Sequence, residues 1–194
     1  MVKKGLLIVL SSPSGGGKTS IAQKLLQKDK NILRSVSCTT RKARPGEKKG
    51  KDYFFVSRSQ FRRMASQNAF LEWAEVHGHR YGTPRSWVER NLKKGRDILF
   101  VIDVQGGRAV KKIHPDALLV FLRPPSLGVL RKRLLGRGSE GPEDLKLRLE
   151  GARWEMRRGR HYDYQVLNDS FSKAVSDLMK IIRRERKRRN LAVN

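Results

Sequence analysis

The sequence is poor in cysteine, in acidic residues and in long apolar runs. Its single cysteine, Cys38, cannot form an internal disulfide, which excludes a disulfide-stapled fold and favours a reducing compartment. No apolar run approaches the ~18 residues of a membrane span. The run Leu6–Leu10 has five residues, and the apolar part of a signal peptide has ~7–15. We therefore expect a soluble, cytoplasmic protein with no membrane partner.

The shortage of acids gives the chain an extreme charge. There are 18 Asp and Glu against 44 Lys and Arg, a formal net charge of +26. This charge predicts attraction to polyanions such as nucleotides, nucleic acids or acidic membrane surfaces, without choosing among them. With 194 residues, 38% of them hydrophobic, the chain is long enough for one globular domain.

Several apolar runs bounded by turn residues predict buried parallel strands. They are residues 6–10, 98–104, 117–122 and, more weakly, 164–167. Helical patterns lie between them, so we expect an α/β fold with a parallel sheet. The apolar stripes after Pro142 and after Ser170 are interpreted as core faces of two helices.

Helix ends can also be placed from the sequence. Ser57 and Gln60 fit a capping box, with an apolar residue on either side of it. Thr83 followed by Pro84 is predicted to be an N-cap and first helical position, and Gly95 to be the stop of that helix.

A glycine-rich loop follows the first predicted strand and precedes a helix. The segment Ser12-Pro13-Ser14-Gly15-Gly16-Gly17-Lys18-Thr19-Ser20 matches G-x-x-x-x-G-K-[ST] except at its first position. Residues Ser14 to Ser20 are the candidate ATP site, where backbone N–H groups approach the phosphates and Lys18 adds a mobile charge. Thr19 is the candidate hydroxyl for Mg²⁺. The plain alternative is a strand-to-helix turn without function.

Ser12 stands where this motif has glycine. If the backbone there needs a positive φ, serine costs about 1–2 kcal/mol of local strain.

A second block specifies the acceptor. The segment Ser37–Glu47, SCTTRKARPGE, is followed by GKDYFF from Gly50 to Phe55. Here the sequence resembles the guanylate kinases, whose signature is S-x-T-T-R-x-x-R-x-G-E with G-x-D-Y-x-F after it. Further matching blocks run in family order almost to the end of the chain. The resemblance implies a P-loop NTPase-type three-layer fold with a parallel central sheet, a GMP-binding subdomain and a helical lid.

The resemblance implies roles for named residues. GMP is expected to be bound by Ser37, Arg41, Arg44, Tyr53, Glu72, Tyr81, Thr83 and Asp103. Two arginines three residues apart suit one phosphate, which prefers bidentate donors. A carboxylate at Glu72 accepts from guanine N1–H and its amine, and adenine leaves it unpaired. Glu72 as an exposed helix residue, and Asp103 as part of a structural ion-pair network, are the alternatives.

The family pattern also has a lid and an adenine contact. Arg133, Arg137 and Arg148 fall in the region that resembles the ATP lid, although any one of them alone also fits a solvated helix face. Asn168 resembles the family's contact to the adenine of ATP. Many guanylate kinases have a second acid two positions before Asp103, where this chain has Val101.

The predicted chemistry is transfer of the γ-phosphoryl group of ATP to GMP or dGMP. The acceptor phosphate has a second pKa near ~6 and needs no general base. Lys18, Arg41, Arg137 and Arg148 are the expected catalytic cations, with Mg²⁺ bound to ATP. We expect one guanylate kinase-like domain over 1–194, with a core (1–34, 91–125, 158–194), a GMP-binding subdomain (35–90) and a lid (126–157).

Three alternatives stay open. The segment 183–189, with six basic residues in seven, suits weak nonspecific nucleic-acid binding or simply an exposed helix end. An interaction module without catalysis, and a P-loop kinase with another acceptor, are the other two. The sequence leaves the oligomeric state open.

Overall fold

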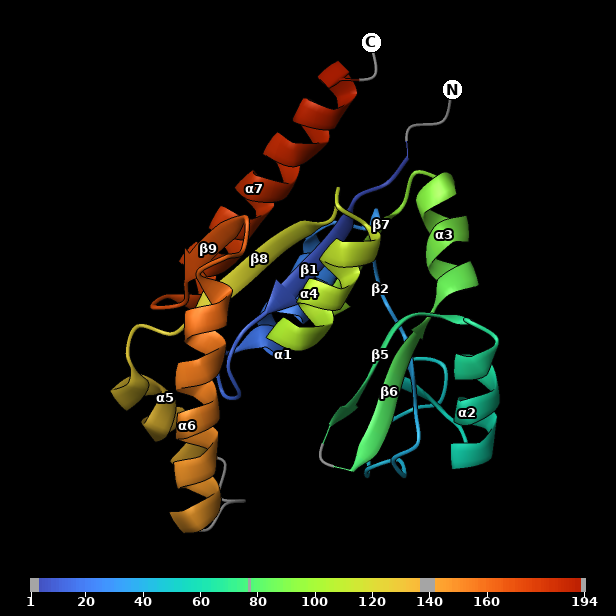
Figure 1. Cartoon of the computed structure of the whole chain (residues 1–194). Helices are drawn as coiled ribbons and strands as arrows, with labels where there is room; N and C mark the ends of the chain where they lie inside the picture. Colours follow the sequence, from blue (N-terminus) through green and yellow to red (C-terminus); the bar gives the residue numbers. More distant parts are fainter. Residues whose placement is uncertain (1–3, 77, 137–141, 193–194) are drawn as a thin grey trace.

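The structure, a computed structural model, describes residues 4–76, 78–136 and 142–192. Its centre is a five-stranded parallel sheet in the order β2-β7-β1-β8-β9 (Figure 1). The strands are β1 (Leu7–Ser11), β2 (Ile32–Arg34), β7 (Asp97–Val101), β8 (Leu118–Arg123) and β9 (Tyr164–Leu167). Leu, Ile, Val and Phe fill β1, β7 and β8 because a sheet covered by helices is buried on both faces.

Helices cover both faces of this sheet and make three layers. On one face lie α1 (Lys18–Lys28) and α7 (Phe171–Ala192). On the other lie α3 (Arg85–Lys93), α4 (Val104–Ile113) and part of α6 (Pro142–Gly159). The short helix α5 (Leu127–Leu135) packs against α6 through a separate apolar cluster. This arrangement confirms the predicted α/β fold with a parallel sheet.

A second, smaller sheet lies beside the first (Figure 1). Its order is β4-β3-β6-β5, and its strands are β3 (Ser37–Thr39), β4 (Tyr53–Phe55), β5 (Phe70–Val76) and β6 (His79–Pro84). Helix α2 (Arg58–Ser66) covers it, with the Phe61 and Phe70 rings stacked at 4.5 Å. None of these strands was predicted, because three of the four have six residues or fewer and much of the sheet is only partly buried.

The predicted helix ends are confirmed at two places and wrong at one. Ser57 and Gln60 form the capping box of α2, and Gly95 ends α3 with a φ of 75°. Thr83 is not an N-cap: it belongs to β6, and Pro84 takes the cap position of α3. The Thr83 hydroxyl is used instead on Glu72, across the strand pair.

The predicted strand 98–104 is too long at its end. Strand β7 stops at Val101, and Val104 already begins α4. The reason is Asp103, whose side chain accepts a hydrogen bond from the Gly106 N–H at 2.8 Å and so caps the helix. A capped helix start ends the extended backbone three residues earlier than predicted.

The C-terminal helix is fastened to the base of the sheet by ion pairs. Arg186 donates from Nε to Asp97 and from Nη1 to Asp29, both at 2.7 Å. Asp97, whose side chain is 3% exposed, also accepts from the Leu6 N–H at 2.7 Å. These bonds connect α7 to the ends of α1, β1 and β7.

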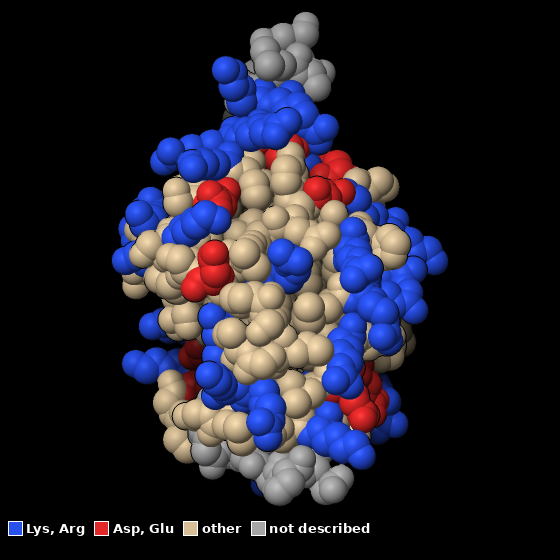
Figure 2. Space-filling model, turned by 90° about the vertical axis from the view of Figure 1, so that its left-hand side faces the viewer, with Lys and Arg blue, Asp and Glu red and all other residues tan. Residues whose placement is uncertain are grey.

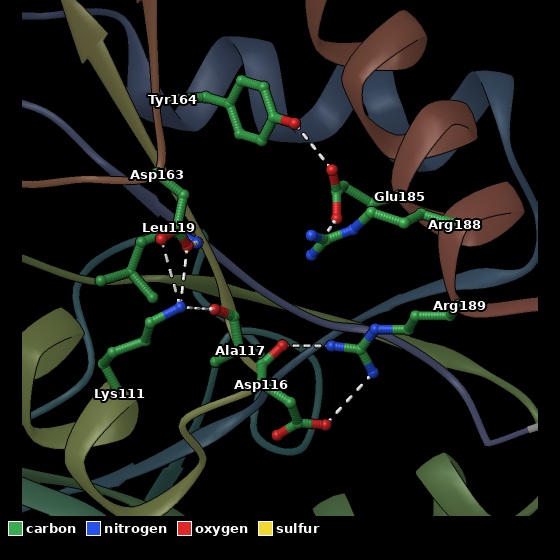
Figure 3. A network of polar contacts seen from close by, with 9 residues as sticks. All are labelled: Lys111, Asp116, Ala117, Leu119, Asp163, Tyr164, Glu185, Arg188 and Arg189. Atoms are coloured by element: carbon green, nitrogen blue, oxygen red, sulfur yellow. Dashed lines mark hydrogen bonds and ion pairs between the residues drawn. The ribbon is translucent and has the colours of Figure 1, made fainter. Parts of the chain in front are cut away.

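A neighbouring set of contacts holds the same end of α7 (Figure 3). Arg189 pairs with Asp116, and the Tyr164 hydroxyl donates to Glu185 at 2.6 Å. Glu185 also pairs with Arg188 at 2.9 Å. Part of the basic segment 183–189 is therefore structural. No helix of the described part of the chain is long and apolar enough to cross a membrane.

Arg186→Met should lower the free energy of unfolding by about 2–3 kcal/mol, because it leaves Asp97 buried without its cation. Arg184→Met is the control, since Arg184 is exposed on the same helix and makes no ion pair among the described residues. Urea denaturation at pH 7 checks both. Equal stability of the two variants would mean that the ion pairs of Arg186 with Asp97 and Asp29 do not stabilise the fold.

Candidate active site

The loop between β1 and α1 depends on its glycines. Gly15 has a φ of 78° and Gly17 a φ of 90°, backbone conformations that side chains disfavour. Gly16 is required for space: a Cβ there would lie 2.6 Å from Ser12 Oγ and 2.9 Å from the Pro13 carbonyl oxygen. The three glycines thus hold the compact turn that a phosphate loop needs.

Ser12 fits this loop without strain. Asn68 is the one non-glycine residue with a positive φ in the part of the chain that the structure describes, so Ser12 avoids the left-handed region. Its side chain is buried, and Oγ donates to the Pro13 carbonyl at 3.0 Å. The departure from the motif therefore carries none of the cost considered from the sequence.

Lys18 points back along the loop. Its Nζ donates to the Ser12 carbonyl oxygen at 3.0 Å. Burial lowers the pKa of Lys18, and the nearby carboxylates of Glu155 and Asp103 oppose that shift. Thr19 and Ser20, at the start of α1, are exposed. Lys18 is thus a desolvated cation held beside two hydroxyls that face solvent.

One face of α6 lies against the loop. Arg148 Nη1 donates to Ser14 Oγ at 3.0 Å, and the carboxylate of Glu155 accepts from the Ser14 N–H. With Ala152 and Gly159, these residues recur at spacings of four, three and four, which aligns them along one side of a helix. Burial raises the pKa of Glu155 to about 7. The helix thus brings a cation and a carboxylate to the phosphate loop.

Asn168 and Arg133 close the loop from the side of β9. The Asn168 side-chain amide donates to the Gly16 carbonyl at 2.9 Å. Arg133 Nη2 donates to the Asn168 carbonyl at 3.1 Å. Both residues predicted for ATP thus lie at the loop, whereas Arg137 lies outside the described residues.

A buried chain of hydroxyls leads to Glu72 in the smaller sheet. The Thr83 hydroxyl donates to Glu72 Oε1 at 2.7 Å, and Ser37 Oγ lies 3.2 Å from Thr83 Oγ1. Because the Thr83 proton is used on the carboxylate, Ser37 is the donor of the second bond. Glu72 is 8% exposed, and burial raises its pKa to about 7. It is a strand residue aimed inward, so the exposed-helix alternative is wrong.

Arg41 is held in a polar clamp nearby. Glu47 accepts from Arg41 Nη1 at 3.0 Å and from Nη2 at 2.8 Å, and Nε donates to the Tyr81 hydroxyl at 3.3 Å. The guanidinium lies 5.4 Å from the centre of the Tyr53 ring. Glu47 raises the pKa of Arg41 above its usual range. The side chain of Arg44 is exposed, while its backbone N–H donates to Glu47 at 2.8 Å.

Asp103 lies between the two halves of the site. It is half-buried at the end of β7, where it caps α4, and its negative charge contributes to the raised pKa values of both Glu72 and Glu155. Ser11 Oγ donates to its backbone carbonyl at 3.2 Å and accepts from the Tyr162 hydroxyl at 2.8 Å. The carboxylate therefore serves as a helix cap and also faces both binding regions.

The donors at the loop suit magnesium better than a transition metal. The described residues contain no group of three or more His, Cys, Asp or Glu able to hold a metal ion. The exposed hydroxyls of Thr19 and Ser20 are protein oxygens at the loop, and Thr19 is the one that the motif assigns to the metal. Mg²⁺ commonly takes few protein ligands and completes its shell with phosphate oxygens and water.

Comparison with known proteins decides what the arrangement is. A family model described as guanylate kinase matches residues 4–185. The chain belongs to the guanylate kinase family. A guanylate kinase from Thermotoga maritima is 46% identical over 183 residues, covering 94% of this chain and 88% of that protein. One from Symbiobacterium thermophilum is 47% identical over 185 residues, covering 95% and 88%.

A solved structure agrees with these sequence relatives. The crystal structure of guanylate kinase from Anaplasma phagocytophilum matches with a TM-score of 0.78 and 39% identity, covering 94% of this chain and 87% of that one. Membership of the guanylate kinase family confirms the resemblance found in the sequence. It makes this protein an enzyme, a nucleoside monophosphate kinase.

Three residues of this guanylate kinase-family site were not singled out from the sequence. Glu47 stood inside the signature without a role, and Tyr162 gave no signal that separates it from a core aromatic. Glu155 does have a signal in the sequence. It follows the buried Ala152 by three residues and so lies on the apolar face of α6, where a carboxylate is unexpected. A search for acids inside apolar helical stripes finds it.

Gly16→Ala should weaken ATP binding at least tenfold, because the added Cβ clashes with the Pro13 carbonyl and forces the loop to move. The control is Gly151→Ala in α6, where a Cβ meets nothing within 4 Å. That variant should bind ATP normally and gain about 0.5–1 kcal/mol of stability from its helical position. Calorimetric titration with ATP checks both, and normal binding by the Gly16 variant would refute the close-packing argument.

Glu72→Gln should stabilise the protein above pH 7, by at most about 3 kcal/mol. The folded pKa of about 7 exceeds the ordinary 4.5, so the folded state loses its proton later than the unfolded chain does. Stability of the parent protein therefore falls as pH rises from 4.5 to 7, and glutamine removes this loss.

Chemical denaturation of parent and Glu72→Gln proteins at pH 5 and pH 8 measures this difference. Glu75→Gln, in the same strand but exposed, is the matched control and should show little change with pH. A gain in stability that is the same at both pH values would mean that burial of the Glu72 charge is not its cause.

Proposed function

We propose that this protein transfers the γ-phosphoryl group of ATP to GMP or dGMP and releases ADP and GDP. The single observation that supports this best is the buried carboxylate of Glu72, tied to Thr83 and Ser37, with Asp103 close enough to act on the pKa of both Glu72 and Lys18. Lys18 and its loop suit a nucleoside triphosphate, and the carboxylate suits guanine. Family membership agrees with both assignments.

Guanine recognition rests on Glu72. An ionised carboxylate accepts from guanine N1–H and the exocyclic amine, whereas adenine offers no donor at N1. The Thr83 bond uses one oxygen of the carboxylate and fixes its rotamer. Because burial raises the pKa of Glu72 to about 7, the affinity for GMP should fall as the pH drops below that value.

Arg41 is the main candidate for the GMP phosphate. Glu47 occupies the Nη1–Nη2 end of the guanidinium. On the Nε–Nη2 edge, Nε donates to the Tyr81 hydroxyl, and one Nη2 N–H remains for an anion. Tyr53 stacks on the plane of the group, and exposed Arg44 lies three residues along the same loop. A phosphate in this place accepts from the remaining Nη2 N–H, and a second, parallel bond from Nε forms when the phosphate replaces the Tyr81 hydroxyl as its acceptor.

Catalysis in this proposal is positioning and charge neutralisation. The acceptor phosphate is ionised at neutral pH and needs no general base. Lys18 neutralises charge on the transferring group, and the loop N–H groups orient the ATP phosphates. When bound with ATP, Mg²⁺ supplies further charge neutralisation, with the Thr19 hydroxyl holding it.

Movement of three parts completes the proposed cycle. The core, the GMP-binding region 35–90 and a lid over 126–157 close around the substrates and exclude water from the transfer. The contacts of Arg148 and Glu155 with Ser14 provide the connection between lid and loop. Arg137 would add a cation from the lid. We place this reaction in cytoplasmic purine nucleotide metabolism, where the free, buried Cys38 stays reduced.

The test is ADP formation from ATP and Mg²⁺ with GMP, AMP, CMP or UMP as acceptor. GMP should be the preferred acceptor, and Lys18→Ala should lower kcat by roughly 10²–10³-fold. Lys24→Ala, which changes an exposed lysine on the same helix, should leave kcat unchanged. The ratio of GMP to AMP turnover should fall in Glu72→Gln.

Two results would overturn the proposal. Folded protein without turnover on any acceptor would favour an interaction module that has lost catalysis. Turnover with a preferred acceptor other than GMP would favour another P-loop kinase, and would remove the role given to Glu72.

A further inference from the structure

The basic residues of α7, apart from Arg188, which is exposed but paired with Glu185, divide into two sets. Arg186 and Arg189 lie against the rest of the domain and form ion pairs with Asp29, Asp97 and Asp116. Another set faces solvent along the helix: Lys173, Lys180, Arg183, Arg184 and Lys187. The first role is structural, so only the second set is available to a partner. The sequence alone treats segment 183–189 as one basic tail, whereas the structure shows that some of its cations are structural and others face solvent.

The outward set forms a continuous stripe. Its members follow at steps of seven, three, one and three residues, which keeps them on one side of an α-helix. From Lys173 to Lys187 the stripe runs about 21 Å at 1.5 Å per residue. Asp177 is the one acid that interrupts it, placed 3.7 Å from both Lys173 and Lys180. The stripe beyond Lys180 is purely cationic.

A groove runs beside this stripe. It has a volume of about 340 Å³ and is lined by Lys28 from the end of α1 and by Ser172, Ser176, Met179, Lys180 and Arg183 from α7. Lys28 and Arg183 make no ion pair among the described residues. The groove therefore presents three cations and two hydroxyl donors. Both kinds of group bind phosphate oxygens.

The wider surface has the same sign. Lys and Arg predominate over Asp and Glu around the projecting end of α7 (Figure 2), and the whole chain carries +26. Such a field attracts polyanions from a distance. The reaction proposed above involves only mononucleotides bound elsewhere, at the carboxyl edge of the sheet. It does not account for a cationic groove on the outside of α1 and α7.

We propose that the groove between α1 and α7, with the stripe beside it, binds the phosphate backbone of nucleic acid without reading its sequence. A single strand places phosphates at short, regular intervals, which suits a linear row of cations. The lining holds hydroxyls and cations but no aromatic side chain, so it contacts backbone rather than bases.

An anionic membrane fits this surface less well. Membrane-bound amphipathic helices bury an apolar face in the bilayer, but the apolar face of α7 is already packed in the core through Val175, Leu178 and Ile182. In α7, Phe171 alone is an exposed large apolar residue among those described. A concave cationic groove also fits a single nucleic-acid strand better than it fits the flat surface of a membrane.

The experiment measures binding of a fluorescein-labelled 20-nucleotide single-stranded RNA to the full chain by anisotropy, from 50 to 200 mM salt. With about five cations engaged, the affinity should fall roughly 100-fold over this range. The groove variant Lys28→Ala/Lys180→Ala/Arg183→Ala should bind at least tenfold more weakly at 50 mM salt and show a shallower salt dependence.

The matched control is Arg90→Ala/Lys93→Ala/Lys94→Ala, which removes three exposed cations at the end of α3. It has the same net charge as the groove variant and should lose less than threefold in affinity. Saturating ATP with Mg²⁺ and GMP should not displace the RNA. Turnover with GMP should be unchanged in both variants, which shows that each is folded.

Four results would overturn the proposal. Equal losses in the two variants would mean that net charge, not this groove, attracts RNA. Displacement by ATP and GMP would move the binding to the active site. Absence of binding at 50 mM salt would remove it altogether. Tighter binding to vesicles containing half phosphatidylserine, lost only in the groove variant, would assign the groove to membranes.

Discussion

Parallel strands that end side by side determine where this protein can do chemistry. Strand β1 leads into the phosphate loop, β7 leads to Asp103, and β9 leads to Asn168, all at one edge of the sheet. Residues far apart in sequence thereby meet: the Asn168 amide holds the Gly16 carbonyl, and Ser11 contacts the backbone of Asp103. Parallel α/β sheets place ligands at this edge. The site follows from the strand order before any side chain is considered.

The few carboxylates of this basic chain fix the positions of its important cationic side chains. At the site, Glu47 fixes Arg41, and the charges of Asp103 and Glu155 offset the cost of burying Lys18. Away from the site, Asp97 and Asp29 hold the last helix through Arg186. A buried charge without a partner is costly, so these acids, alone or in pairs, fix the positions of Arg41, Lys18 and Arg186. Cations left over from this pairing include the stripe on the outside of α7 and Lys28 at the end of α1.

The sequence predicted the parts of the fold that rest on local patterns. Continuous apolar runs located β1, β8 and β9, and residue chemistry placed the capping box at Ser57. The small sheet was missed because its short strands are held by pairings over long sequence distances, such as Cys38 with Gly82. Thr83 was misread since a hydroxyl before proline resembles an N-cap, while its true partner, Glu72, lies across a strand pair.

The hydrogen bonds that hold Arg41 and Arg148 lower the entropic cost of binding phosphates in the reaction proposed above. Arg41 already makes four bonds through its five N–H groups, and the free one lies on Nη2, next to Nε. Arg148 is likewise held on Ser14. A long side chain fixed in advance loses little rotamer entropy when a phosphate arrives. In the proposed reaction, phosphate binding then replaces a weak partner or fills an open edge, and the free energy gained remains for closing the site around the reacting groups.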